Sequence, residues 1–166
     1  YSSNSGSTYS EYTAFDPVDI TSPVVISGLT GSTAYLIKLR AVSDFGDSVD
    51  SSPVSVTTLT APSAPTSLVA TGYYLSAQIS FTPGADGGSA LTNYEYALST
   101  NGGSTYGSFT ALSPTNTTSP IDITGLANNT TYSVKLRAVS TAGSGAESSA
   151  VSVTTNQNML ISYLVV

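Results

Sequence analysis

Apolar and polar side chains alternate along short segments of the chain, as they do in β-strands that bury one face. In residues 131–140, the inward face carries Tyr132, Val134, Leu136 and Ala138. The outward face of the same segment carries Ser133, Lys135 and Arg137. A second segment, residues 77–81, places apolar side chains at every second position, namely Ala77, Ile79 and Phe81. We therefore expect two strands whose apolar faces meet in one core.

Further short apolar segments, separated by turn residues, predict strands at 67–70, 93–98, 106–109, 121–124 and 151–153. Asn101-Gly102-Gly103 indicates a hairpin turn, because Asn and Gly tolerate positive φ. Residues 141–149 are rich in Gly and Ser and are expected to form a loop. No stretch has a helical period. The pattern predicts an all-β fold, a seven-stranded β-sandwich.

The chain contains an internal repeat with a constant offset of 97 residues. Residues 38–43 recur as 135–140, and residues 54–58 recur as 151–155. An ungapped alignment of residues 1–58 with residues 98–155 gives 31 identities. A repeat of this length corresponds to a whole domain. We expect the C-terminal part of one module at residues 1–59, a complete module at residues 60–156 and a hydrophobic tail at residues 157–166.

The segment Gly125-Leu126, followed by residues 131–140, resembles the fibronectin type III module. The resemblance covers nearly all of residues 1–156 and implies tandem β-sandwiches, the first of them incomplete. It also implies that a tyrosine at the corner of the sandwich packs over a leucine, which gives the structural residues Tyr35, Leu29, Tyr132 and Leu126. Phe81 stands where the family usually has Trp. Among family members, the Ser/Thr/Gly-rich tandem copies of bacterial and viral surface proteins are the most similar.

Composition excludes most catalytic chemistry. The chain has no Cys and no His, so it lacks disulfides, Cys/His zinc sites, thiolate nucleophiles and Ser-His-Asp triads. The net charge of −6 argues against binding to nucleic acid. No apolar run approaches the length of a membrane helix, so we expect no membrane insertion within this segment. We expect neither an enzyme nor a cofactor.

All four basic residues lie on the outward face of two equivalent strands: Lys38, Arg40, Lys135 and Arg137. They form either a binding stripe or a solubilising face that protects the sheet. Three acidic residues, Asp44, Asp47 and Asp50, crowd one loop and form either an interaction site or a solvated acidic loop. A calcium site needs six to eight oxygen ligands, and adding Asp16 and Asp19 does not give a recognised calcium loop.

Three asparagines match the N-glycosylation acceptor pattern, namely Asn116, Asn128 and Asn129. Chance matches are expected in so Thr-rich a chain, and two of these residues also suit a turn. Tyr73 and Tyr74 fall in the first interstrand turn. They are expected either to contact a sugar or a neighbouring subunit, or to pack between modules.

The chain starts within a module and ends in the apolar segment 159–166, so we expect a piece of a longer array. In the alternative, the tail inserts into an incomplete sandwich of another subunit as a donor strand. The Pro-containing linker at residues 60–65 is expected to give a semi-rigid rod.

The sequence favours a noncatalytic structural or adhesion-type protein of a cell or virion surface, with tandem modules acting as spacer and protein-interaction surface. Two alternatives remain open: an accessory module of a secreted polysaccharide-degrading enzyme, and a filament subunit that uses its tail as donor strand. Expected partners are other subunits, surface proteins or glycans. The expected location is extracellular, on a cell surface or on a virion surface.

Overall fold

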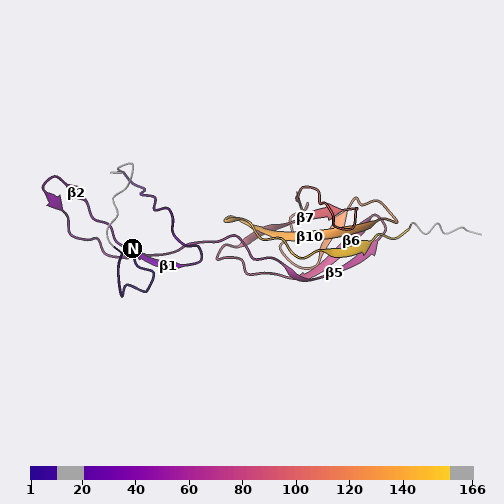
Figure 1. The fold of residues 1–166 in the computed structure, drawn as a ribbon, viewed down its shortest axis with the longest axis horizontal. Helices are drawn as coiled ribbons and strands as arrows, with labels where there is room; N and C mark the ends of the chain where they lie inside the picture. Colours follow the sequence, from indigo (N-terminus) through magenta and orange to yellow (C-terminus); the bar gives the residue numbers. More distant parts are fainter. Residues whose placement is uncertain (11–20, 158–166) are drawn as a thin grey trace, which may run out of the picture. The chain divides into compact units, whose positions relative to one another are not determined.

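A computed structural model describes residues 1–10 and 21–157 of the chain. The chain forms two compact units, which we call unit 1 (Tyr1–Thr60) and unit 2 (Ala61–Val166). Every regular element in the described residues is a β-strand (Figure 1). Within the same residues, no helix has the length and apolarity needed to cross a membrane. The predictions for Asp16, Asp19 and the tail from residue 158 onward lie outside the described residues.

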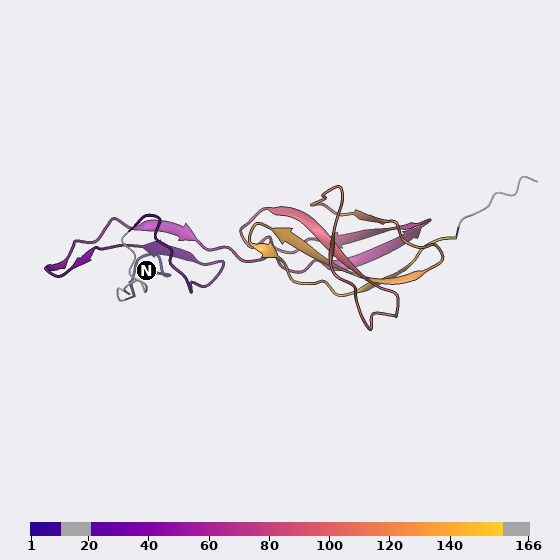
Figure 2. The same ribbon diagram turned by 90° about the horizontal axis from the view of Figure 1, so that it is seen from above.

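Unit 2 is built from two antiparallel sheets that face each other (Figure 1 and Figure 2). The first sheet has the order β5-β6-β9, with β5 at Thr66–Tyr73, β6 at Ser76–Thr82 and β9 at Ile121–Thr124. The second has the order β11-β10-β7-β8, and β12 pairs with β10. Its strands are β7 at Leu91–Ser99, β8 at Thr110–Ala111, β10 at Thr131–Ser140, β11 at Gly143–Ser144 and β12 at Val151–Thr154.

The core of unit 2 lies between these sheets and consists of the inward residues expected from the alternation. Both Ile79 of β6 and Leu136 of β10 are fully buried. Phe81 packs edge-on against Tyr94 of β7, with the ring centroids 4.7 Å apart. Burying one such side chain contributes about 1.5–3 kcal/mol, so these positions dominate the stability of the sandwich.

The strand predicted at residues 106–109 is wrong, because the chain forms a folded loop there and the strand, β8, begins only at Thr110. One backbone hydrogen bond still joins the loop to β7, from the Gly107 N–H to the Leu98 carbonyl at 3.0 Å. The loop is held by its own polar groups. The Ser99 hydroxyl accepts hydrogen bonds from the backbone N–H groups of Asn101 and Gly103, and the Thr105 N–H donates to Asn101 Oδ1 at 3.0 Å. Local side-chain bonds of this kind compete with the sheet for backbone groups. The loop expected at residues 141–149 likewise contains a short pairing, β11 with β10.

Two glycines of unit 2 allow other backbone segments to approach closely. A Cβ on Gly72 of β5 would lie 1.9 Å from the carbonyl oxygen of Thr154 in β12. A Cβ on Gly145 would lie 2.4 Å from the Pro62 carbonyl oxygen, which accepts a hydrogen bond from Ala146 N–H at 3.1 Å. The Pro-containing segment is therefore docked on unit 2 from Pro62 onward.

Unit 1 contains β1 (Ala34–Ile37), β2 (Val42–Ser43), β3 (Gly46–Asp47) and β4 (Val54–Thr57). In Figure 1, β1 and β2 carry labels. The β1 strand pairs antiparallel with β4, and β2 pairs with β3 as a hairpin. Ser2 exchanges two backbone hydrogen bonds with Leu36, of 2.8 and 2.9 Å. Ser99 is paired with Ser133 at the same positions of unit 2, so the two units share this register.

The tyrosine corners have the same geometry in both units. Tyr132 Oη accepts the backbone N–H of Ala127 at 3.0 Å, and Tyr35 Oη accepts that of Thr30 at 3.0 Å. Leu126 is buried and Leu29 is half-buried. Each ring thus fills a core position while its hydroxyl satisfies a backbone donor of the turn.

Candidate functional site

The outward face of β10 carries the two cations of unit 2, and each is paired with a carboxylate. Lys135 Nζ lies 3.0 Å from Glu147 Oε2. Arg137 Nε lies 2.6 Å from Oε2 of Glu95, a residue of the neighbouring strand β7 that stands directly opposite Arg137. These side chains are partly exposed, so the pairs contribute modestly to stability and mainly fix the orientation of the cations.

Two aromatic rings from the loop at residues 100–109 cover the same cations. Lys135 Nζ lies 4.7 Å from the ring centroid of Tyr106, and Arg137 Cζ lies 4.1 Å from that of Phe109. The Tyr106 hydroxyl is hydrogen-bonded to Ser133 Oγ at 2.7 Å. Each cation therefore contacts a ring and a carboxylate, and the loop is attached to the sheet by cation–π contacts.

Unit 1 repeats part of this arrangement. Lys38 Nζ lies 3.6 Å from Asp50 Oδ2 and 4.5 Å from the ring centroid of Tyr9. Arg40 Nη2 lies 3.0 Å from Asp47 Oδ2. Two of the three aspartates singled out from the sequence thus neutralise basic residues, while Asp44 is exposed between β2 and β3. Among residues 1–10 and 21–157, no group of three or more acidic residues is placed to hold a metal ion.

The charges of this face are therefore compensated within the chain. Each of the four basic residues has a carboxylate partner, at 2.6–3.6 Å. An incoming anion would have to displace that partner, so the arrangement does not favour recognition of phosphate or sulfate groups. It is better suited to holding loops and neighbouring strands in place.

The β2–β3 hairpin and the residues just after it expose large apolar side chains. Phe45 is fully exposed, and Val42 and Val49 are also largely exposed. The positions of unit 2 equivalent to Phe45 and Val49 hold Ala142 and Ala146. The hairpin of unit 1 therefore presents apolar surface next to Asp44 where unit 2 has small residues.

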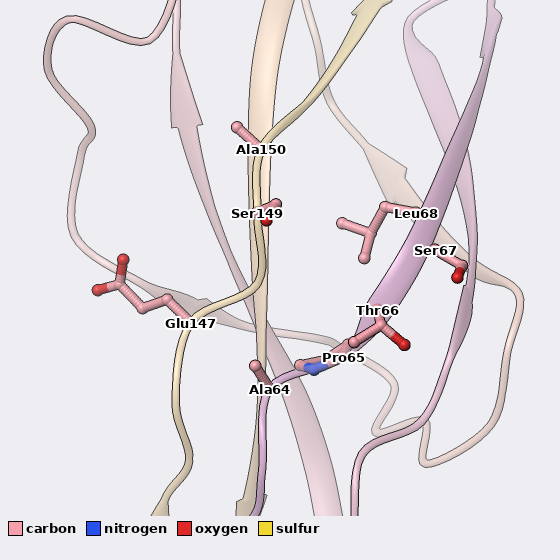
Figure 3. Close-up of a pocket in the computed structure, with 8 residues that line it drawn as sticks. All are labelled: Ala64, Pro65, Thr66, Ser67, Leu68, Glu147, Ser149 and Ala150. Carbon is pink, nitrogen blue, oxygen red and sulfur yellow. The ribbon is translucent and has the colours of Figure 1, made fainter.

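A groove of about 370 Å³ lies in unit 2 between the start of β5 and the segment that leads into β12. Its walls are formed by Ala64, Pro65, Thr66, Ser67, Leu68, Glu147, Ser149 and Ala150. Figure 3 shows Leu68 directed into the space, while the hydroxyl of Thr66 and the carboxylate of Glu147 point away from it. A small-molecule site needs polar groups that converge on the ligand, and this groove lacks them.

A sequence profile described as "Fibronectin type III domain" matches residues 63–154, more than half of the chain. This chain belongs to the fibronectin type III family. Fibronectin type III domains mediate protein interactions and are generally noncatalytic. They commonly occur in extracellular or surface proteins. No curated protein matches the sequence significantly.

Several solved structures are similar to this chain at low sequence identity. A structure of domains from titin has a TM-score of 0.55 and is 18% identical, covering 76% of this chain and 41% of its own. The FN1–FN3 domains of chicken CNTN1 have a TM-score of 0.49 and are 19% identical, and the match covers 78% of this chain and 44% of the solved chain. The FN5 domain of Drosophila Lar has a TM-score of 0.45 and is 23% identical, and the match covers 58% of this chain and 98% of the solved chain. The family match and the similarity to the titin domains confirm the predicted all-β sandwich.

Three asparagines of this fibronectin type III module match the glycosylation pattern. Asn128 and Asn129 are exposed at a turn, and Asn129 has a φ of 48°. Asn116 is half-buried, and its Nδ2 donates to the Pro120 carbonyl at 3.3 Å. The turn pair is therefore more accessible to a modifying enzyme than Asn116 is.

Sequence reasoning did not find the serine hydroxyls that bind backbone N–H groups, one of them buried (Ser148) and its counterpart exposed (Ser51). Ser148 Oγ accepts the Leu136 N–H at 2.9 Å, and in unit 1 Ser51 Oγ accepts the Leu39 N–H at 3.0 Å. The signal available in the sequence was the identity of these serines at the offset of 97 residues. Polar identities between internal copies thus mark side chains that bind the backbone of the fibronectin type III scaffold.

Tyr94 is the exception among the buried hydroxyls. Its side chain is fully buried in unit 2, and its Oη has no hydrogen-bond partner among the described residues. Burial raises the pKa of the Tyr94 hydroxyl above its ordinary value, because the phenolate cannot be solvated in the core. The hydroxyl is therefore a cost to the fibronectin type III core.

We predict that Tyr94→Phe leaves the free energy of unfolding of unit 2 unchanged or raises it by about 1 kcal/mol at pH 7. The folded wild type keeps the Tyr94 proton to a higher pH than the unfolded chain does. Ionisation of Tyr94 therefore does not lower the free energy of unfolding below about pH 10, and lowers it progressively as the pH rises above about 10. In urea unfolding, the free energy of unfolding should fall less between pH 7 and pH 10.5 in the variant than in the wild type. A loss at least as large as in the wild type would contradict the role of burial.

Proposed function

We propose that the chain belongs to a noncatalytic protein of a cell or virion surface, in which tandem fibronectin type III modules act as spacer and protein-interaction surface. The observation that carries the proposal is that charged and hydroxyl side chains bind other groups of the same chain. In the described residues, the four basic side chains are paired with carboxylates of the chain, and hydroxyls such as those of Ser148 and Ser51 bind backbone N–H groups. Such a surface supports a framework rather than a reaction.

The tandem arrangement is supported by matched contacts. In unit 2, Thr155 Oγ1 donates to the Ala127 carbonyl at 2.6 Å; in unit 1, Thr58 Oγ1 donates to that of Thr30 at 2.6 Å. The hydrogen bonds of the corner tyrosines also match between the units, as do those that Ser148 and Ser51 accept from the Leu136 and Leu39 N–H groups. Residues 1–59 are accordingly the C-terminal part of a second module.

The spacer role is supported by the short connection between the units. Thr58 N–H still donates to the Thr33 carbonyl of unit 1 at 3.0 Å, and Pro62 already accepts a hydrogen bond within unit 2. Only residues 59–61 therefore separate Thr58, which is hydrogen-bonded within unit 1, from Pro62, which is hydrogen-bonded within unit 2. A connection this short limits the separation of the modules.

For the interaction role, the β2–β3 hairpin is the surface we favour. Asp44 and Phe45 are exposed there, whereas Asp47 and Asp50 are paired with Arg40 and Lys38. Lys135 and Arg137 are likewise held by Glu147 and Glu95. The hairpin thus offers unpaired charge and apolar area together, which suits a protein partner.

A labelling experiment tests the proposed location. Antibodies raised against unit 2 should label intact source cells or particles, and external protease should remove the label while an internal marker protein survives. Labelling that appears only after permeabilisation would contradict a surface role.

The accessory role in a polysaccharide-degrading enzyme makes a different prediction, based on the exposed side chains of Tyr73 and Tyr74. Exposed aromatic rings are able to stack on sugar rings. Under our proposal, the full chain is not retained on insoluble cellulose, chitin or xylan. Retention that disappears in the Tyr73→Ala, Tyr74→Ala double variant would favour the accessory module instead.

A further inference from the structure

Three consecutive large apolar side chains are exposed at the turn between β5 and β6. Tyr73, Tyr74 and Leu75 are 47%, 48% and 39% exposed, respectively. Tyr73 pairs with Ser76, so Tyr74 and Leu75 are the two central residues of a hairpin. Such positions normally hold small or polar residues. We call residues 73–75 the apolar turn.

The backbone of the apolar turn is also strained. Leu75 has a φ of 57°, a left-handed conformation that a bulky residue rarely adopts. Its carbonyl accepts the Leu126 N–H at 3.0 Å, which holds the turn against the loop that follows β9. Glycine or asparagine would adopt this conformation more easily. A bulky apolar residue is thus kept in an unfavourable conformation at an exposed position, and such a combination points to a contact made there.

The chain leaves the sandwich directly beside the apolar turn. Asn156 N–H donates to the Tyr73 carbonyl at 3.0 Å, and Asn156 forms a parallel bridge with Tyr74. The segment that follows, residues 159–166, consists of apolar and aromatic residues except for Ser162. Because a chain spans at most about 3.6 Å per residue, Met159 can be no farther than about 11 Å from Asn156. The start of the apolar segment is therefore necessarily close to the apolar turn.

We propose that residues 159–166 bind over the apolar turn of the same chain. The segment covers the rings of Tyr73 and Tyr74 and packs against Leu75, which offsets the cost of the left-handed conformation. Burial of apolar surface drives the contact. The short connection from Asn156 makes it intramolecular, with a high effective concentration of the segment. The inference goes beyond the proposed function, because it assigns a contact that fixes the direction in which the chain leaves unit 2.

The segment does not continue the pattern of the linker that precedes unit 2. At the offset of 97 residues, Met159 and Ser162 stand at the positions of Pro62 and Pro65. Both prolines are buried in unit 2. Neither Met nor Ser restricts φ as proline does. Residues 159–166 are therefore a poorer linker to a following module than residues 60–65 are, and their apolar side chains need a different cover.

Nitration of tyrosines by tetranitromethane, measured for each peptide by mass spectrometry, tests the cover. Tyr73 and Tyr74 should be nitrated at least about fivefold more slowly in the full chain than in a chain that ends at Gln157, as expected when most molecules have the segment bound. Tyr1 is the internal control, because it is 47% exposed, as Tyr73 is, and belongs to unit 1. Its rate should be the same in both chains.

Paired charge variants of the full chain separate apolar packing from the mere presence of the segment. The double variant Leu160→Asp, Ile161→Asp should restore fast nitration of Tyr73 and Tyr74, because carboxylates are costly to bury. The matched control is Gln157→Asp, Asn158→Asp, which adds the same charge at polar positions beside the segment. It should keep nitration slow.

The strained residue provides a second measurement. Leu75→Gly should raise the Tm of the chain that ends at Gln157, because glycine adopts positive φ readily. In the full chain the rise should be smaller, because the same substitution removes a side chain on which the segment packs. Equal rises in the two chains would contradict a contact between Leu75 and the segment.

Equal nitration of Tyr73 and Tyr74 in the full and shortened chains would overturn the inference, as would slow nitration that persists in Leu160→Asp, Ile161→Asp. Protection that is lost on dilution would also overturn it, since a second copy of the chain would then be the occupant. These outcomes are independent of the antibody labelling, so the contact and the surface role fail separately.

Discussion

Leu136→Ala should lower the free energy of unfolding of unit 2 by about 3 kcal/mol, the middle of the range for a leucine removed from a packed core. Leu136 is fully buried in β10, between the two sheets. The deletion removes apolar burial and leaves a cavity that the paired strands cannot close. Chemical denaturation followed by circular dichroism measures the change. A loss below about 1 kcal/mol would mean that this core tolerates collapse.

Leu39→Ala is the matched control, because the chain offers the same module position in a different environment. Leu39 is 44% exposed, so its truncation removes less burial and should cost about 1 kcal/mol or less. The comparison uses one substitution at two positions related by the repeat. Equal losses in the two variants would contradict the difference in burial between Leu39 and Leu136.

Gly72→Ala should destabilise unit 2 by about 1–3 kcal/mol, the usual cost of overpacking. The new Cβ would meet the Thr154 carbonyl oxygen at 1.9 Å, and both groups belong to the backbone. Neither side can move without separating β5 from β12. Thermal unfolding is a suitable measurement, with a lower Tm as the expected result.

The control for this substitution is Gly107→Ala. A Cβ on Gly107 would lie 3.8 Å from its nearest neighbour, the Leu98 carbonyl oxygen, which is ordinary contact. The variant should therefore keep a Tm close to that of the wild type. If the two variants were equally unstable, the loss would come from removing glycine and not from the approach of β12.

Most strands of unit 2 and their buried positions could be predicted from the alternation of apolar and polar residues. The inward positions of β6, β9 and β10 followed from period two, because a strand that buries one face must place its apolar residues there. The positions of Tyr132 and Tyr35 followed from the resemblance to a family. The boundary between the two compact units falls after Thr60. The assignment of residues 1–59 and 60–156 to modules stays a prediction.

The candidate site was less accessible to sequence reasoning. The outward direction of Lys135 and Arg137 was predictable, but their partners come from separate elements: Glu95 from β7, Glu147 from the segment before β12, and two rings from a loop. The last part of that loop, residues 106–109, was predicted as a strand because Tyr106 and Phe109 suit one, whereas Asn101-Gly102-Gly103 was predicted as a turn. Its conformation depends instead on the hydroxyl of Ser99 and the amide of Asn101, whose hydrogen bonds have no periodic signature.

The sequence by itself determined the class of the fold, the length of the internal repeat and the absence of Cys and His chemistry, since periodicity and composition can be read locally. The hydrogen bonds that both units share were found only in the structure, although identical serines at the offset of 97 residues marked some of them. Tertiary structure decided which of the repeated apolar residues are buried. Leu39 and Leu136 occur in the same hexapeptide, Lys-Leu-Arg-Ala-Val-Ser, yet one is exposed and the other is not. Burial depends on strands that are distant in sequence, and in unit 2 these strands are β5, β6 and β7.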